Sequence, residues 1–210
     1  VFVTDNVEGI VPEFLTLLRG VIDSPDIPLN VSRSYLQADG AVKKISAYIT
    51  RKVADKLASL FKNDRDGFEK KWNDIKIVIE YGMLSEEKFF EKSEKFALYP
   101  TVDEKFYTYE ELHNKIKAKQ TDKDDKLVIL YSSDKQAQHS YIENAKDKGY
   151  EVLLLDSPIV SHLIQKLESS KEKIQFARVD SDHIDNLINK DNNKVSKLND
   201  DQKKELEEIV

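Results

Sequence analysis

The segment RGVIDSPDIPLNVSRSYLQ, residues 19–37, combines a short apolar start with a run of turn-forming residues. Its two prolines fix the backbone angle φ and remove two backbone donors, so the residues around them cannot form an interior helix or a central strand. Ser34 is followed three residues later by Gln37, a capping-box spacing that predicts a helix beginning at Ser34. Arg33 is therefore expected at the end of a loop, beside the free N–H groups of a helix N-terminus. This corner suits an anion, because the guanidinium fork matches phosphate oxygens.

A second interpretation of the segment is that Arg33 is an exposed loop arginine and the serines are only caps. The residues themselves favour the first, because the segment resembles a long signature of the ninety-kilodalton heat-shock chaperone family. That signature reads RG-hydrophobic-hydrophobic-DS-x-D-hydrophobic-PLN-hydrophobic-SR-x-x-LQ. The resemblance continues upstream, where PEFLTLLRG, residues 12–20, matches the family's PxWLxFVRG with Phe14 in place of Trp.

The resemblance implies that residues 19–37 are the catalytic loop of the family's middle domain. In the family, the arginine of the Ser-Arg pair reaches the γ-phosphate of ATP held in a separate N-terminal domain, and a glutamine one helical turn later supports the contact. By position these roles fall on Arg33 and Gln37, with Asn30 and Ser32 shaping the loop. Ser34 departs from the family, which usually has Glu there, and this change concerns only the start of the following helix.

The resemblance further implies that the chain is the later part of the middle domain of a bacterial, cytoplasmic, homodimeric chaperone. Such a chaperone uses ATP with Mg²⁺ to remodel non-native client proteins. In the family, ATP binding belongs to the N-terminal domain and stable dimerisation to the C-terminal domain. We therefore expect this chain alone to be inactive and to hold no cofactor.

The composition is that of a soluble globular protein, with 210 residues, 40% hydrophobic and 34% charged. The absence of cysteine excludes disulfides and cysteine nucleophiles, and it fits a reducing compartment. A net charge of −6 with interspersed Lys and Glu argues against general nucleic-acid binding. Apolar runs such as Val152–Leu155 are far too short to span a membrane. The chain has no signal peptide and begins at Val1 in strand-like sequence, so we expect it to be part of something longer.

Helical periodicity dominates the first half of the chain. After a short expected strand at residues 1–4 and a helix from Pro12, apolar residues recur every three or four positions in a long helix: Val42, Ile45, Ile49, Val53, Leu57 and Leu60. A second helix is expected to end near Gly82 and a third to run from Ser85 to before Pro100. Four aromatic residues are expected in the core of this helical layer: Phe68, Trp72, Phe89 and Phe96.

The second half predicts a small parallel sheet. A helix beginning with the capping box of Thr108 and Glu111 comes first, and a final helix from residues 199–200 comes last. Between them strands alternate with helices, in the order strand 127–131, helix 137–148, strand 151–155, helix 158–167 and strand 174–179. This alternation predicts a sheet covered on both faces.

The expected fold class is therefore α/β, with a catalytic-loop segment and helical layer followed by a small three-layer α/β/α unit. The expected division is residues 1–105 for the loop segment and helical layer, residues 106–190 for the α/β/α unit, and residues 191–210 for a linker helix towards a C-terminal domain.

Other candidate sites lie on the α/β/α unit. Polar residues follow the predicted parallel strands, at the edge where open α/β sheets bind ligands: Ser132, Asp134, Asp156 and Asp180. No glycine-rich phosphate loop follows any strand, and such residues are also ordinary helix caps. The four histidines lack zinc-site spacing, so no metal site is expected. His162 and Leu163 could form a weak client-facing surface, although core packing explains the apolar residues around them as well.

The sequence is compatible with three functional hypotheses. The first is the chaperone fragment, with non-native clients and the missing domains of its own chain as partners, and with no nucleic acid or membrane. The second is a passive scaffold or partner-binding module. The third is a small α/β enzyme that uses Asp156 and Asp180.

Overall fold

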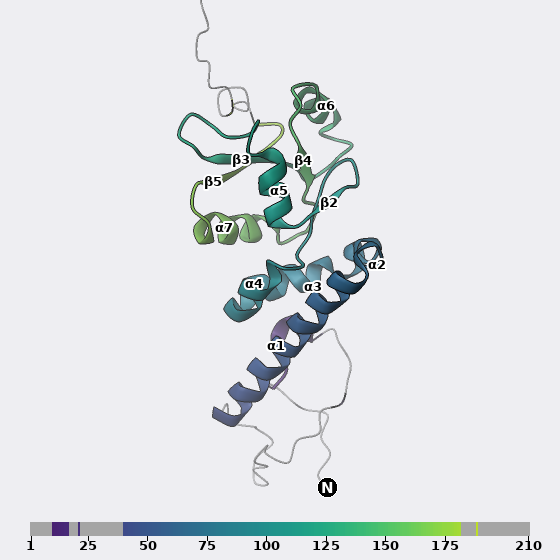
Figure 1. Cartoon of the computed structure of the whole chain (residues 1–210), viewed down its shortest axis with the longest axis vertical. Helices are drawn as coiled ribbons and strands as arrows, with labels where there is room; N and C mark the ends of the chain where they lie inside the picture. Colours follow the sequence, from purple (N-terminus) through teal and green to yellow (C-terminus); the bar gives the residue numbers. More distant parts are fainter. Residues whose placement is uncertain (1–9, 17–20, 22–39, 182–187, 189–210) are drawn as a thin grey trace, which may run out of the picture.

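The structure is a computed structural model that describes residues 10–16, 21, 40–181 and 188 (Figure 1). Two parts are stacked along its long axis. The helical part contains the short 3₁₀ helix η1 and helices α1 to α4, and the sheet unit contains strands β1 to β5 and helices α5 to α7. The predicted α/β fold class is confirmed by this arrangement.

The helical part is built on one long helix, α1, Gly40–Asn63, which matches the expected periodicity. It is followed by α2 (Arg65–Lys70), α3 (Trp72–Ser85) and α4 (Glu87–Ser93), while η1 covers Glu13–Leu15. The expected second helix is thus two helices separated by a tight turn at Lys71, whose N–H bonds the carbonyl of Phe68 at 3.1 Å. Asp64 caps α2 by accepting a hydrogen bond from the Gly67 N–H at 2.9 Å.

Gly82 lies inside α3 instead of ending it. A Cβ at this position would come within 2.8 Å of ring atoms of both Phe14 and Phe89. The missing side chain therefore lets η1 and α4 pack directly on the backbone of α3. All four aromatic residues predicted for the core of this part are buried, and the Phe89 and Phe96 rings meet edge to face at 5.9 Å.

A small antiparallel hairpin that the sequence did not indicate connects the two parts. Its strands are β1, Tyr99–Pro100, and β2, Phe106–Tyr107. Helix α5, Tyr109–Ile116, follows at once and begins with the predicted capping box of Thr108 and Glu111.

The main sheet has three parallel strands, as predicted, and their order in the sheet is β4-β3-β5. They are β3 (Leu127–Ser132), β4 (Val152–Leu154) and β5 (Ile174–Arg178). Helix α6 (His139–Asp147) precedes β4, and helix α7 (Val160–Ser170) precedes β5. Gly149 ends the α6 region with a positive φ of 75°, the conformation expected of a C-cap glycine.

Alternate residues of the central strand β3 face two different cores. Val128 and Leu130 pack with Ile142 of α6. Leu127 and Ile129 belong to a larger cluster that includes α5, α7 and the aromatic residues of the helical part. The sheet is therefore covered on both faces, and the larger of the two clusters is shared by the helical part and the sheet unit.

Several expectations lie outside the described residues. They are the strand at residues 1–4, the helix start at Ser34 and the terminal helix from residues 199–200. The proposed boundaries after residues 105 and 190 remain predictions. Within the described residues, no helix combines the length and apolar character needed to cross a bilayer.

Candidate functional site

The residues expected to act on a phosphate, Arg33 and Gln37, lie outside the described residues, as do Asn30 and Ser32. The structure describes the two elements that flank them in sequence, η1 before and α1 after.

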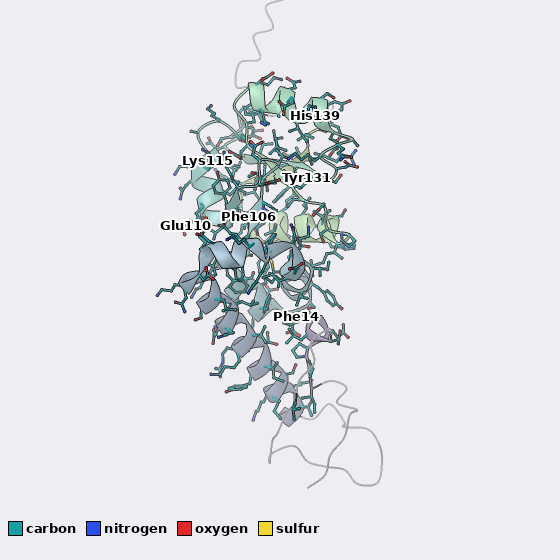
Figure 2. All side chains as sticks on the ribbon, turned by 90° about the vertical axis from the view of Figure 1, so that its right-hand side faces the viewer. Phe14, Phe106, Glu110, Lys115, Tyr131 and His139 are labelled. Carbon is teal, nitrogen blue, oxygen red and sulfur yellow. The ribbon has the colours of Figure 1, made fainter. Side chains whose placement is uncertain are left out.

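The upstream flank is anchored by aromatic packing. Phe14 of η1 is only 2% exposed, and its ring lies 4.7 Å from that of Phe89 on α4. Figure 2 places Phe14 within the helical part, whereas His139 on α6 lies near the far end of the sheet unit. The Tyr81 hydroxyl on α3 donates a hydrogen bond to the Glu13 carboxylate at 3.1 Å, and this contact raises the pKa of Tyr81. The chain thus approaches residue 17 from a fixed position.

The downstream flank is the N-terminal half of α1. Val42 is buried near its start, and the buried Thr50 donates its hydroxyl to the carbonyl of Ser46 at 3.0 Å. Further along, Asp55 pairs with Lys92 of α4 at 2.6 Å, and this hydrogen bond lowers the pKa of Asp55. Helix α1 is therefore held against α4 by packing and by charge.

A basic groove of about 440 Å³ lies between α1 and α4. Four cationic side chains, one carboxylate and one aromatic ring line it together with Ala47: Lys44, Arg51, Lys88, Lys92, Glu91 and Tyr48. The guanidinium carbon of Arg51 lies 5.3 Å from the centre of the Tyr48 ring, which is half exposed. Surfaces of this kind attract acidic groups of a partner.

The candidate residues at the strand ends do not form a joint site. Ser132 donates its hydroxyl to the Gln138 side-chain oxygen at 2.8 Å, and Asp134 accepts hydrogen bonds from two N–H groups just before α6. Both side chains are therefore engaged in local structure, although neither is the N-cap of α6, which is Gln138.

The two remaining strand-end carboxylates are each paired with a cation of the same chain. Asp156 pairs with Lys76 of α3, and Asp180 pairs with Arg178, both at 2.5 Å. Partial burial acts to raise the pKa of Asp180, but hydrogen bonds from Arg178 and Gln138 outweigh it and lower that pKa. The two carboxylates follow β4 and β5, which lie on opposite sides of β3, roughly 10 Å apart by the usual strand spacing. Among the described residues no cluster suited to a metal ion is found.

His162 and Leu163, the possible client-facing pair, both lie on α7 but differ in exposure. His162 is exposed, whereas Leu163 is 3% exposed and belongs to the larger core cluster. Core packing, the other interpretation, therefore describes Leu163, and only His162 of this pair is available at the surface.

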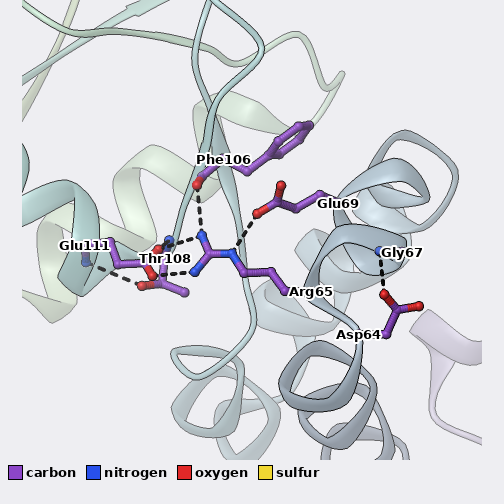
Figure 3. A network of polar contacts seen from close by, with 7 residues as sticks. All are labelled: Asp64, Arg65, Gly67, Glu69, Phe106, Thr108 and Glu111. Atoms are coloured by element: carbon purple, nitrogen blue, oxygen red, sulfur yellow. Dashed lines mark hydrogen bonds and ion pairs between the residues drawn. The ribbon is translucent and has the colours of Figure 1, made fainter.

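Arg65 holds together a network of polar contacts that the sequence did not indicate. Its guanidinium bonds both carboxylate oxygens of Glu111, at 2.5 and 2.9 Å, as well as Glu69 at 2.7 Å and the carbonyl of Phe106 at 3.0 Å (Figure 3). These bonds raise the pKa of Arg65 and lower that of Glu111. The capping box marked Glu111, but no sequence signal linked it to Arg65.

Comparison with known proteins decides the family. The model of the family described as "Hsp90 protein" matches residues 1–210. The chain belongs to the Hsp90 family.

Curated members of this family are similar to the chain over most of its length. "Chaperone protein HtpG" of Bacteroides thetaiotaomicron is 62% identical over 194 residues, which cover 92% of this chain and 28% of the relative. The protein of the same name from Porphyromonas gingivalis is 54% identical over 206 residues, or 98% of this chain and 30% of the relative. A more distant one, from Alcanivorax borkumensis, is 32% identical over 173 residues, or 82% of this chain and 28% of the relative. The chain is therefore of the HtpG type and spans less than a third of the length of these Hsp90 relatives.

Proposed function

We propose that this chain is the later part of the middle domain of an HtpG-type chaperone, and that Arg33 acts on ATP bound in another domain of the same protein. The observation that carries the proposal is the segment 19–37, whose Ser-Arg pair and following Gln37 match the family signature. Membership of the Hsp90 family supports the match, because the signature lies within the residues that the family model covers.

In this proposal the chain supplies charge stabilisation. ATP with Mg²⁺ would provide the phosphoryl group whose transfer to water drives the chaperone cycle. The donors of the segment fit such a group, since Arg33 has a planar fork for phosphate oxygens and Gln37 has an amide donor. Arg33 would stabilise the negative charge of the transferred group, as an arginine finger does, while Asn30 and Ser32 hold the shape of the loop.

The described flanks support this role. An arginine finger is effective only when it is held in position, because a displacement of about 1 Å can cost two orders of magnitude in rate. Phe14 fixes the chain before the segment, and the contacts of α1 with α4 fix the chain after it. The described residues on either side of the segment therefore belong to packed elements.

The rest of the function lies in parts of the protein beyond this chain. We propose that residues 1–105 carry the loop segment and helical layer, residues 106–190 the α/β/α unit, and residues 191–210 the link to a dimerisation domain. The partners would be non-native client proteins, the N-terminal ATPase domain and the C-terminal domain of the same cytoplasmic homodimer. The chain alone should neither hydrolyse ATP nor bind it tightly.

The proposal is tested in the full-length chaperone with the variant Arg33→Ala. Turnover at saturating ATP should fall by about 10³-fold or more, while the dissociation constant for ATP changes little. Arg178→Ala, which removes an exposed arginine of β5 paired with Asp180, is the matched control and should leave both quantities unchanged. A large loss of ATP affinity with unchanged saturated turnover would refute the assigned role.

A partner-binding module is the second candidate, and the basic groove between α1 and α4 favours it. In that case Lys88→Glu should weaken capture of an acidic partner and leave ATP turnover intact, and Arg33→Ala should have no effect on turnover. The same two measurements therefore separate the two proposals.

A further inference from the structure

Glu80 is a buried glutamate with one carboxylate oxygen that has no hydrogen-bond partner among the described residues. It lies on α3, where that helix faces the sheet unit, and it is 7% exposed. Its Oε2 atom is, within the described residues, the one buried side-chain oxygen or nitrogen without a hydrogen-bond partner. Its carboxyl group accepts a hydrogen bond from the Ser157 hydroxyl, which belongs to the segment between β4 and α7. A buried carboxylate with so little hydrogen bonding is costly, because it has lost its water.

The charges around Glu80 do not neutralise it. Lys76 lies one helical turn earlier on α3. Its ammonium group bonds Asp156 of the sheet unit at 2.5 Å, across the joint between the helical part and the sheet unit. Lys76 therefore attracts Glu80 only at longer range, while Asp156 repels it. From β1 the buried Tyr99 also faces this region, and burial raises the pKa of its phenol, so Tyr99 is uncharged at neutral pH. Two carboxylates thus compete for one lysine.

A proton on Glu80 would remove this conflict. Burial raises the pKa of Glu80 and the charge of Asp156 adds to the effect, whereas the Ser157 hydrogen bond and Lys76 oppose it. A neutral carboxyl leaves Lys76 to Asp156 and carries no uncompensated charge. An ionised carboxylate would instead compete with Asp156 for Lys76 or draw water into the joint.

We propose that Glu80 is a proton-binding switch in the joint between the helical part and the sheet unit. With the proton bound, α3 and the β4–α7 segment stay closed around the pair of Lys76 and Asp156. Loss of the proton pulls Lys76 towards Glu80, weakens the pair and loosens the joint. This property belongs to the described residues and does not depend on the role proposed for Arg33.

Carboxyl NMR of the ¹³C-glutamate-labelled 210-residue chain tests the proton affinity directly. Glu80→Gln identifies the signal of Glu80, which should titrate above the exposed glutamates. Asp156→Asn should move this titration to lower pH, because it removes a repelling charge and frees Lys76. A Glu80 signal that titrates with the exposed glutamates would overturn the proposal, and the Asp156→Asn shift keeps it testable if Glu80→Gln does not fold.

Hydrogen exchange tests the loosening of the joint. The amides of Leu155 and Val160, which bond Ser132 and Ser157 respectively, report on the β4–α7 segment. Between about pH 5 and about pH 8, after correction for intrinsic exchange, their protection should fall by about tenfold or more in the wild type and stay constant in Glu80→Gln. Glu110→Gln, at an exposed glutamate of α5, should behave as the wild type does. Equal loss of protection in the wild type and Glu80→Gln would contradict the switch.

Discussion

Arg65 and Glu111, 46 residues apart in the sequence, form a bidentate ion pair that joins α2 to the start of α5 (Figure 3). Glu111 also closes the capping box by accepting the Thr108 N–H at 2.8 Å. The ring of Phe61 lies 5.2 Å from the guanidinium carbon and covers it from the helical part. One arginine therefore fixes the helical part to the first helix of the sheet unit.

Replacing this arginine by lysine should destabilise the protein. Arg65→Lys keeps a positive charge but loses the fork that holds Glu111, Glu69 and the carbonyl of Phe106 together. Because the Arg65 side chain is about a third exposed, we expect a loss of about 1–2 kcal/mol in the free energy of unfolding, measured by urea denaturation. Lys146→Met is the control, because it breaks the exposed pairs of this α6 lysine with Asp103, which lies between β1 and β2, and with Glu143 of α6, and it should cost clearly less than Arg65→Lys. Equal costs would show that the fork of Arg65 has no special role.

The same pair should make stability depend on pH in the acid range. The hydrogen bond from Arg65 lowers the pKa of Glu111 in the folded protein. The stabilisation is therefore complete above the ordinary glutamate pKa of about 4.3 and is lost as the pH falls through the lowered folded value. Urea unfolding should show the wild type more stable than Glu111→Gln at neutral pH, with the difference shrinking below about pH 4. A difference that stays constant down to the lowest pH would show that Glu111 acts without its charge.

Glycine 82 should be hard to replace, although alanine is the better helix former. Gly82→Ala places a Cβ 2.8 Å from the rings of Phe14 and Phe89, which are both buried and cannot turn away. We expect a net loss of about 1–3 kcal/mol in the free energy of unfolding. Gly40→Ala is the matched control, since an added Cβ there meets nothing within 4 Å. It should be neutral or slightly stabilising, and a similar loss at both positions would contradict the packing explanation.

Local patterns in the sequence predicted most of the described elements. The repeat from Val42 to Leu60 predicted α1, and the alternation after residue 126 predicted the parallel sheet and its helices. These succeed because burial of one face imposes a period on neighbouring residues. The turn at Lys71 was missed because the apolar spacing continues through it, and the two-residue strands of the hairpin are too short to show any period.

Contacts between distant residues were not predictable in the same way. The capping box identified Glu111, but its bond to Arg65 depends on how α2 and α5 are brought together. A glycine in a helical pattern suggests a helix end, and Gly82 was therefore expected to end the helix. Its actual role, to leave space for Phe14, appears only in the packed structure. The roles of Arg33 and Gln37 come from family resemblance, and they stay predictions because these residues lie outside the described part of the chain.

Single-turnover hydrolysis tests most directly whether Arg33 stabilises charge on the transferred phosphoryl group. ATP would first be bound to the full-length chaperone, so that the observed rate no longer depends on affinity. If Arg33 has this role, Arg33→Ala should hydrolyse its bound ATP about 10³-fold or more slowly than the wild type. An unchanged single-turnover rate would contradict it and leave residues 19–37 with a structural role.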